Sequence, residues 1–485
     1  MSQSVKDKLR SFFGSENIEF LQHTKNYLSA SIVSNILTAA TVPLFSRVLT
    51  TAEYGVISIF TAVVSMLTIL SSLDINSGIV RYFLDAPPDF GRCLGSSLVF
   101  LFGFNVLFMG GVFLFREPLA AFCELDTDLF LFAMGVSFFA GIVEIFLALT
   151  NAAKQSRKYS VVTILKTSTN LALFLVLIFV LADRKYMGKV YADLAVMVVL
   201  GGYALYSLNR LADYTVEKKH IRYVLLFSLP LVPHAMSRFI LGYFDRIIIR
   251  QLTTAEATGL YSFAYDVGTV MNMVVLASVR AWRPIFFEEY RDGQLAKLER
   301  MAREYADYIY LAAIGISLFA VDAVMLLADK SYYTAIPLVP IVVLGYVFVF
   351  LYTLFFQYAS YRKRTELISL STFIAGFANI GLNYAFIPVY GYEAAAYTTL
   401  ASFFLLFLLH YLNARVILKE KVLSLKNLAP NLLLTLFIVS VYMVLDRIVA
   451  SYLLMLPIRL GLMAAGAYLL IFRKKRRAEA RDHDE

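Results

Sequence analysis

Long apolar runs, separated by short polar connections, occupy nearly the whole chain. About 20 apolar residues cross roughly 30 Å of hydrocarbon as a helix, which satisfies its own backbone hydrogen bonds where water is absent. We count fourteen such runs, and the last two are joined by a very short connection at Asp446 and Arg447. They lie near residues 27–46, 54–73, 94–115, 128–149, 160–182, 190–208, 222–249, 259–279, 305–327, 336–358, 366–388, 392–413, 428–447 and 452–472. The pattern predicts an all-α polytopic membrane protein with about fourteen transmembrane helices.

Lysine and arginine gather in every second connection. The basic segments are the N-terminus and residues 154–158, 218–222, 291–303, 362–364, 419–426 and 473–477. Since cytoplasmic loops hold the excess of positive charge, this alternation predicts a multi-pass protein of the bacterial inner membrane with both termini cytoplasmic. The polar N-terminal stretch does not have the order of a cleavable signal peptide. The net charge of +9 fits attraction to anionic membrane lipids, so we expect no nucleic-acid partner.

Composition supports the same class and argues against an enzyme. Hydrophobic residues make up 59% of the chain and charged residues only 16%, whereas soluble domains carry nearer a quarter charged. The two cysteines and five histidines show no metal-ligand spacing, and no phosphate-binding glycine loop is present. We therefore expect no catalytic residue, no metal and no cofactor. The connection from about 280 to 304 is the longest, and it reads as an amphipathic basic segment on the membrane surface.

A short duplication divides the chain. The sequence Leu-Thr-Thr-Ala-Glu follows the first span at residues 49–53 and the seventh span at residues 252–256. Six spans separate the copies, so the two halves share one orientation and form parallel repeats. We therefore predict two six-helix lobes plus two C-terminal helices. The expected boundaries are 1–26 for a cytoplasmic segment, 27–213 and 214–414 for the lobes, 415–472 for the last two helices and 473–485 for a basic tail.

These motifs resemble a known family. The Thr51–Gly55 turn, its counterpart after the seventh span and the Gly78–Phe83 stretch are similar to those of Wzx-type oligosaccharide flippases. Such flippases belong to the multidrug, oligosaccharidyl-lipid and polysaccharide (MOP) exporter superfamily. The resemblance implies a V-shaped, two-lobed bundle with alternating access. Its expected substrate is an undecaprenyl-diphosphate-linked oligosaccharide, flipped to the periplasmic leaflet for O-antigen, lipopolysaccharide, capsule or exopolysaccharide assembly. Other polysaccharide-assembly proteins are expected partners.

Polar residues inside spans are costly in lipid and mark candidate sites. Asn35 shares one face of the first span with several hydroxyl residues, which indicates either a hydrated lumen, where Asn35 would bind substrate, or close helix packing. In the seventh span, Pro230 and Pro233 predict a kinked or broken helix. His234 and Arg238 follow them, and we expect both to contact substrate.

Charged residues suggest specific pairs. Counting along the helices puts Arg238 and Asp266 at similar depth, so a pair between them is feasible, either structural or substrate-binding. Lys166, a candidate for substrate binding, and Glu144 form a second possible pair nearer the cytoplasmic side, where a structural role is favoured. Asp245 is a further candidate for ion coupling or pairing.

Three arginines lie near the predicted membrane interfaces. Arg47 and Arg81 are candidates for binding an anionic substrate. Snorkelling to the membrane surface would equally explain these two and Arg246.

Three other functions remain open from the sequence. A cation-coupled multidrug exporter of the same superfamily would often carry a carboxylate in its first-lobe helices, and the first span has none. A membrane glycan polymerase or ligase would need a sizeable periplasmic loop, and the predicted periplasmic loops are short. A structural scaffold would not need charges at the bilayer middle.

Overall fold

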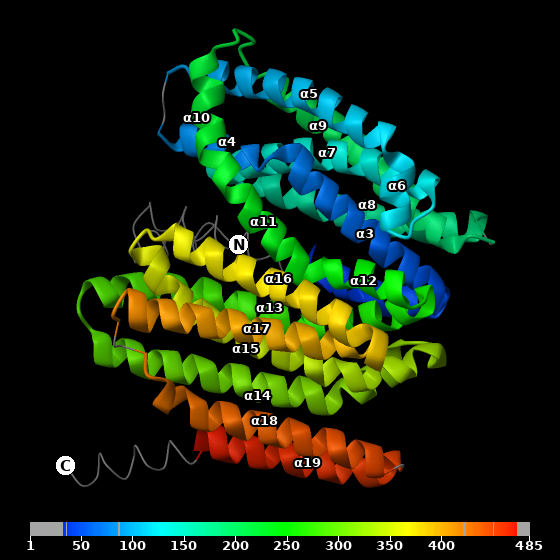
Figure 1. Cartoon of the computed structure of the whole chain (residues 1–485), viewed down its shortest axis with the longest axis vertical. Coiled ribbons are helices and arrows are strands. Elements are labelled where there is room, and N and C mark those ends of the chain that lie inside the picture. Colours follow the sequence, from blue (N-terminus) through cyan, green and yellow to red (C-terminus); the bar gives the residue numbers. More distant parts are fainter. Residues whose placement is uncertain are drawn as a thin grey trace, which may run out of the picture. The chain divides into compact units, whose positions relative to one another are not determined.

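The computed structural model describes residues 33–34, 36–85, 88–181, 183–420, 423–449 and 451–472. All regular elements among these residues are helices, and thirteen are long and apolar enough to cross a membrane. A shorter apolar helix, Ile36–Val48, lies where the first span is predicted. The predicted all-α polytopic fold is therefore confirmed (Figure 1).

The chain divides into two compact units. The first unit contains Val56–Met236 and the described residues up to Thr41. Its helices are α4 (Ile75–Leu84), α5 (Phe90–Leu114), α6 (Arg116–Phe122), α7 (Thr127–Ala152), α8 (Ser156–Val180), α9 (Lys185–Asn209), α10 (Lys218–Ser228) and most of α3 (Thr51–Ser72). Helix α9 packs against α7 and α8, and α4 packs against α7 and α10. Gly78 allows α4 to approach α10 so closely that its backbone N–H donates to Ser228 Oγ, 3.2 Å away.

The connection between α9 and α10 is pinned to the start of α5. We call residues 210–217 the linker. The Asp213 N–H donates to the Gly91 carbonyl at 2.8 Å, and a Cβ at Gly95 would overlap the Asp213 carbonyl oxygen. Arg92 lies 3.3 Å from Asp213 and 3.5 Å from Glu217. The linker backbone therefore fits α5 only because two glycines leave room for it.

Asp89, just before α5, joins a second group of contacts at the same end. It accepts from the Tyr82 hydroxyl at 2.8 Å and lies 3.0 Å from Nε2 of the buried His220 on α10. These two hydrogen bonds, Tyr82 first, lower the pKa of Asp89 to about 2. A charged carboxylate thus holds α4, α5 and α10 together.

The second unit contains Val42–Gly55 and the chain from Ser237 onward. Its helices are α12 (Asp245–Leu252), α13 (Ala255–Arg291), α14 (Leu295–Leu327), α15 (Val339–Tyr361), α16 (Thr365–Tyr390), α17 (Ala394–Leu412), α18 (Leu425–Ile448) and α19 (Tyr452–Ala467), with the end of α11 (Val232–Phe239). Short 3-10 or π turns in this unit occupy Ile240–Phe244, Lys330–Leu338, Asn413–Ile417 and Tyr468–Phe472. Helix α15 packs against α13, α14 and α17, so its almost wholly apolar sequence is buried.

The last two helices attach to α14 through polar contacts as well as apolar ones (Figure 1). Asn431 of α18 donates to Asp307 of α14 at 2.5 Å. Further along α14, Asp322 pairs with Arg459 of α19, whose side chain is fully buried. Interhelical hydrogen bonds of this kind hold helices together in lipid, where apolar contact alone gives little preference. The predicted C-terminal pair of helices is thus docked at defined positions.

One predicted connection is wrong. We expected a basic surface segment from about 280 to 304, but α13 continues to Arg291 and α14 begins at Leu295. Charged side chains lower the hydropathy there without breaking helical hydrogen bonding, and even Pro284 is accommodated within α13. Three residues connect the two helices, and the middle one, Gly293, has the positive φ of +73° that glycine adopts readily.

The two copies of the duplicated pentapeptide meet inside the second unit. In the first copy, Thr50 Oγ1 accepts from the Glu53 N–H at 3.2 Å, while Glu53 accepts from the Thr50 N–H at 2.9 Å, which is a capping box that starts α3. In the second copy, Thr254 caps α13. A Cβ at Gly55 would overlap the Ala255 carbonyl oxygen, and a Cβ at Gly259 would overlap that of Thr51. Two helix N-termini therefore touch backbone to backbone.

Candidate polar sites within the spans

The span predicted to break at its prolines is interrupted twice. Helix α10 ends at Ser228, a 3-10 turn at Leu229–Leu231 contains Pro230, and α11 follows. A π turn at Ile240–Phe244 then leads into α12. Proline lacks the N–H that a continuous helix needs, so the first interruption was predictable and is confirmed. The π turn contains no proline, and no feature of the sequence predicted it.

A buried arginine follows directly after the π turn. Arg246 is only 4% exposed, and the neighbouring Asp245 is 1% exposed. The guanidinium donates from Nη1 to the Gly242 carbonyl at 2.6 Å, and the same nitrogen lies 3.4 Å from Asp245 Oδ1. Its Nη2 lies 3.9 Å from Asp266 Oδ1 on α13. The interpretation that Arg246 snorkels is wrong, because its charge is neutralised inside the second unit.

Tyrosines surround this charged group. Tyr54 donates to Asp266 Oδ2 at 2.6 Å, and the Tyr261 hydroxyl donates to Asp245. The Arg246 guanidinium also lies 4.8 Å from the Tyr265 ring centroid and 5.2 Å from that of Tyr243. Rings and hydroxyls thus provide contacts that water would otherwise supply to the three charges.

A file of polar side chains extends from Asp245 into α16 and α17. Thr399 hydrogen-bonds to Asp245 and accepts from Asn379 Nδ2 at 3.2 Å. Asn383 Nδ2 donates to Asn379 Oδ1 at 3.2 Å, and the Thr398 hydroxyl donates to Asn383. All five side chains are buried. Such a file on membrane spans is expensive to keep unless it is fully hydrogen-bonded or serves a function.

Arg238 does not join this group. Its side chain is exposed, and among the described residues no carboxylate lies within ion-pairing distance of it. The expected pair with Asp266 is wrong, because the π turn lies between Arg238 and α12 and the partners of Asp266 are Tyr54 and Arg246. Arg238 interacts electrostatically with Tyr352 on α15.

Arg47 and Arg81 are engaged at helix ends. Arg47 donates to the carbonyls of Leu326 at 2.6 Å and Leu327 at 3.0 Å, which satisfies the end of α14. Arg81 lies 3.4 Å from Asp85, one turn later in the chain. Both arginines therefore have structural partners, and substrate contact by either stays a prediction.

The other predicted residues fall into different parts of the chain. His234 is half-buried on α11. Asn35 lies outside the described residues. Both stay predictions as substrate-binding groups.

The first unit has its own charged group on α7, α8 and α9. Lys166 interacts electrostatically with Glu144 and Asp193, but its Nζ does not come within the 4.0 Å of a Glu144 carboxylate oxygen that an ion pair requires. Asp193 instead pairs with Lys189 and accepts from Asn170 Nδ2 at 2.7 Å. The predicted pair is therefore part of a looser, larger charged group.

Thirteen candidate spans, a few of which carry buried or half-buried charges, define a polytopic all-helical membrane fold. Solved structures agree on the fold. The chain is similar to the structure titled "Lipid II flippase MurJ, inward closed conformation", with TM-score 0.72, 14% identity and coverage of 91% of this chain and 98% of that one. It is also similar to an inward-facing multidrug resistance MATE family transporter of the MOP superfamily, with TM-score 0.66, 15% identity and coverage of 80% and 94%.

The sequence comparisons identify the family. Residues 20–289 match the family described as "Polysaccharide biosynthesis protein", and the chain belongs to it. "Lsg locus putative protein 1" of Haemophilus influenzae is 24% identical over 278 residues, which are 56% of this chain and 66% of that protein, slightly under two thirds of its length. An "Uncharacterized membrane protein" of the same organism is 23% identical over 295 residues, or 59% and 69%. The predicted polysaccharide family and the predicted fold are therefore confirmed, because the chain matches that family and shares its fold with a lipid II flippase and a MATE transporter.

Proposed function

We propose that this chain is a flippase for lipid-linked oligosaccharides. It moves them by alternating access from the cytoplasmic to the periplasmic leaflet. Membership of the polysaccharide biosynthesis family and the MOP transporter fold support this function. The product would feed O-antigen, capsule or exopolysaccharide assembly. We place the chain in the bacterial inner membrane with cytoplasmic termini and keep the boundaries 27–213 and 214–414 for its two parallel lobes.

The observation that carries the proposal is the exposed guanidinium of Arg238. The interrupted span runs from Lys218 to Leu252, so Arg238 lies about 30 Å from one end and about 21 Å from the other along a helix. That depth falls inside a hydrocarbon core of roughly 30 Å. An unpaired cation there is costly unless an anionic group meets it. A guanidinium suits a diphosphate because its donors engage two oxygens at once.

Transport in proteoliposomes tests this role. A fluorescent diphosphate-linked oligosaccharide would be supplied to one leaflet, and its appearance in the other would be timed. Arg238→Glu should abolish flipping, and Arg238→Lys should retain part of the rate because it keeps charge without the fork of donors. Arg222→Glu is the matched control, since Arg222 is exposed on α10 of the same span near its end. An unchanged rate in Arg238→Glu would refute the proposal.

A cation-coupled multidrug exporter is the second candidate. The observation that favours it is the buried file from Asp245 through Thr399 and Asn379, in a fold shared with MATE transporters. Dye efflux driven by a sodium or proton gradient, lost in Asp245→Asn, would support this candidate if the same vesicles failed to flip the glycan lipid.

Cysteine labelling in intact cells tests the orientation. We expect a cysteine at Thr51 to react with a membrane-impermeant reagent and one at Lys363 to be protected. The reverse pattern would mean that the topology is inverted.

A further inference from the structure

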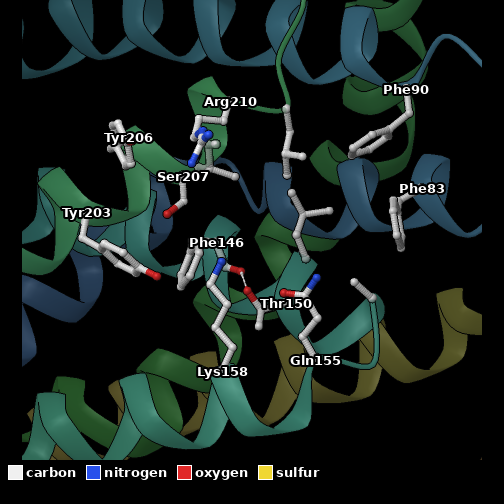
Figure 2. Close-up of a pocket in the computed structure, with 14 residues that line it drawn as sticks. Phe83, Phe90, Phe146, Thr150, Gln155, Lys158, Tyr203, Tyr206, Ser207 and Arg210 are labelled. Carbon is white, nitrogen blue, oxygen red and sulfur yellow. Dashed lines mark hydrogen bonds between the residues drawn. The ribbon is translucent and has the colours of Figure 1, made fainter.

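A cavity lies within the first unit, separate from the polar groups described above. Its volume is about 540 Å³, within the range of sites for small ligands. It is lined by the last turns of α7 and α9, the first turn of α8 and the facing ends of α4 and α5. Figure 2 shows these segments around one hollow.

The charged part of the lining is purely cationic. Lys158 and Arg210 line the cavity, and none of the fourteen lining residues is an aspartate or glutamate. Lys158 Nζ lies 4.8 Å from the Phe146 ring centroid and 5.9 Å from that of Tyr203, and Arg210 lies 5.8 Å from that of Tyr206. Neither cation has an ion pair with a described carboxylate. Two positive charges are thus held beside aromatic rings and are neutralised by no carboxylate among the residues that the structure describes.

The opposite side of the cavity is apolar. Phe83 and Phe90 lie there, across from Arg210, Tyr203 and Lys158 (Figure 2). Leu149 of α7 is a further apolar residue of the lining. A ligand that fills the cavity must therefore combine an anionic head with hydrocarbon.

The depth of the cavity fits such a ligand. Helix α7 ends at Ala152, α8 begins at Ser156 and α9 ends at Asn209, so the lining lies within about two turns of the ends of three spans. Aromatic and basic side chains at this level face lipid headgroups. The exposed Lys154 and Arg157 lie on the same end and add positive charge outside the lining.

We propose that this cavity binds the phosphate of an anionic lipid, with Lys158 and Arg210 on the phosphate oxygens and the first carbons of the tail against Phe83 and Phe90. The shared chemistry is a phosphate ester on a long hydrocarbon chain. Bulk anionic phospholipid and a polyprenyl phosphate both supply it. The site does not depend on whether the chain flips glycans. Because Arg210 begins the linker to α10, the bound lipid also restrains the linker backbone.

Binding to the purified full-length chain in neutral detergent tests the site. Native mass spectrometry would titrate phosphatidylglycerol, polyprenyl phosphate, diacylglycerol and inorganic phosphate separately. Each cation contributes a charge-assisted hydrogen bond, so Lys158→Gln and Arg210→Gln should each weaken binding of the phosphate lipids about tenfold. Lys154→Gln and Arg157→Gln, which remove the same charges outside the lining, should change it by less than about threefold. Competition between the two phosphate lipids then identifies the preferred source.

Several results would overturn the proposal. Equal losses in the control variants would mean general attraction to a basic surface. Equal binding of diacylglycerol would mean an apolar groove without phosphate recognition, and equal binding of inorganic phosphate would mean that the tail is irrelevant. Hydrogen exchange gives a second readout. Phosphatidylglycerol should slow the exchange of the linker amides in the parent chain. It should leave their exchange rate unchanged in the double variant that carries both Lys158→Gln and Arg210→Gln. Slowing in that double variant would equally count against the site.

Discussion

Arg246 and Arg238 lie eight residues apart on one interrupted span, yet the structure gives them opposite roles. Arg246 is buried beside Asp245 and Asp266, whereas Arg238 is exposed and pairs with no carboxylate in the part of the chain that the structure describes. Methionine has a similar length and carries no charge, so the same substitution can be made at both positions. We expect Arg246→Met to reduce stability strongly and Arg238→Met to reduce transport while leaving stability nearly unchanged.

The magnitude follows from what Arg246 leaves behind. The substitution removes a charged donor 2.6 Å from the Gly242 carbonyl and leaves Asp245, only 1% exposed, without its cation. Breaking a buried ion pair from one side costs about 3–5 kcal/mol. Asp266 adds less to this cost, because its side chain is 39% exposed and keeps the hydrogen bond from Tyr54. For Arg238→Met we expect a change within about 0.5 kcal/mol.

Unfolding in mixed detergent micelles measures both variants on one scale. Adding Asp245→Asn to Arg246→Met should recover most of the loss, because a neutral amide replaces the stranded carboxylate. A loss below about 1 kcal/mol in Arg246→Met, or an equal loss in Arg238→Met, would refute the assignment of the buried charge to Arg246. No recovery in the double variant would show that the cost arises from packing instead of charge.

Three further predictions follow from the helix contacts. Arg459→Leu should cost about 3 kcal/mol and make the last two helices sensitive to proteolysis, whereas adding Asp322→Leu should restore both properties. Gly95→Ala should cost about 1–3 kcal/mol in unfolding free energy because its methyl displaces the linker backbone, while Gly103→Ala on the same helix has open space and should cost nothing. The lowered pKa of Asp89 contributes stability that is complete above about pH 4 and is lost as the pH falls towards about 2. The thermal midpoint of Asp89→Asn should therefore change less with pH across that range than the midpoint of the parent chain.

The sequence predicts what depends on local pattern. Hydropathy locates the spans because a chain segment in hydrocarbon must satisfy its own backbone hydrogen bonds as a helix. Pro230 marks the first interruption of the seventh span because proline has no backbone N–H to donate. Hydropathy misses the last turns of α13 and the first turns of α14 because it follows the membrane boundary. Both helices extend beyond that boundary into polar surroundings, where α13 ends at Arg291 and α14 begins at Leu295.

The candidate site was only partly predictable. Asp245 and Asp266 stand out as charges on spans, but the fold decides which arginine meets them, and the π turn places Arg246 there. Asn379 and Asn383, four residues apart on α16, are a signal that sequence inspection could have used. The roles of Arg238, His234, Lys166 and Glu144 in transport stay predictions.

The contact between Gly55 and Gly259 limits how the two halves of the chain can diverge. Gene duplication ordinarily frees one copy of a motif to drift while the other keeps its role. Here each glycine faces the backbone of the other copy, and the nitrogen of each lies 3.0 Å from where a Cβ on its counterpart would stand. Alanine at either position would displace the backbone of both copies, so a substitution at one glycine has the same structural consequence as a substitution at the other. We expect this glycine pair to tolerate less variation among relatives than the apolar runs that it joins, where many residues of similar volume serve equally well.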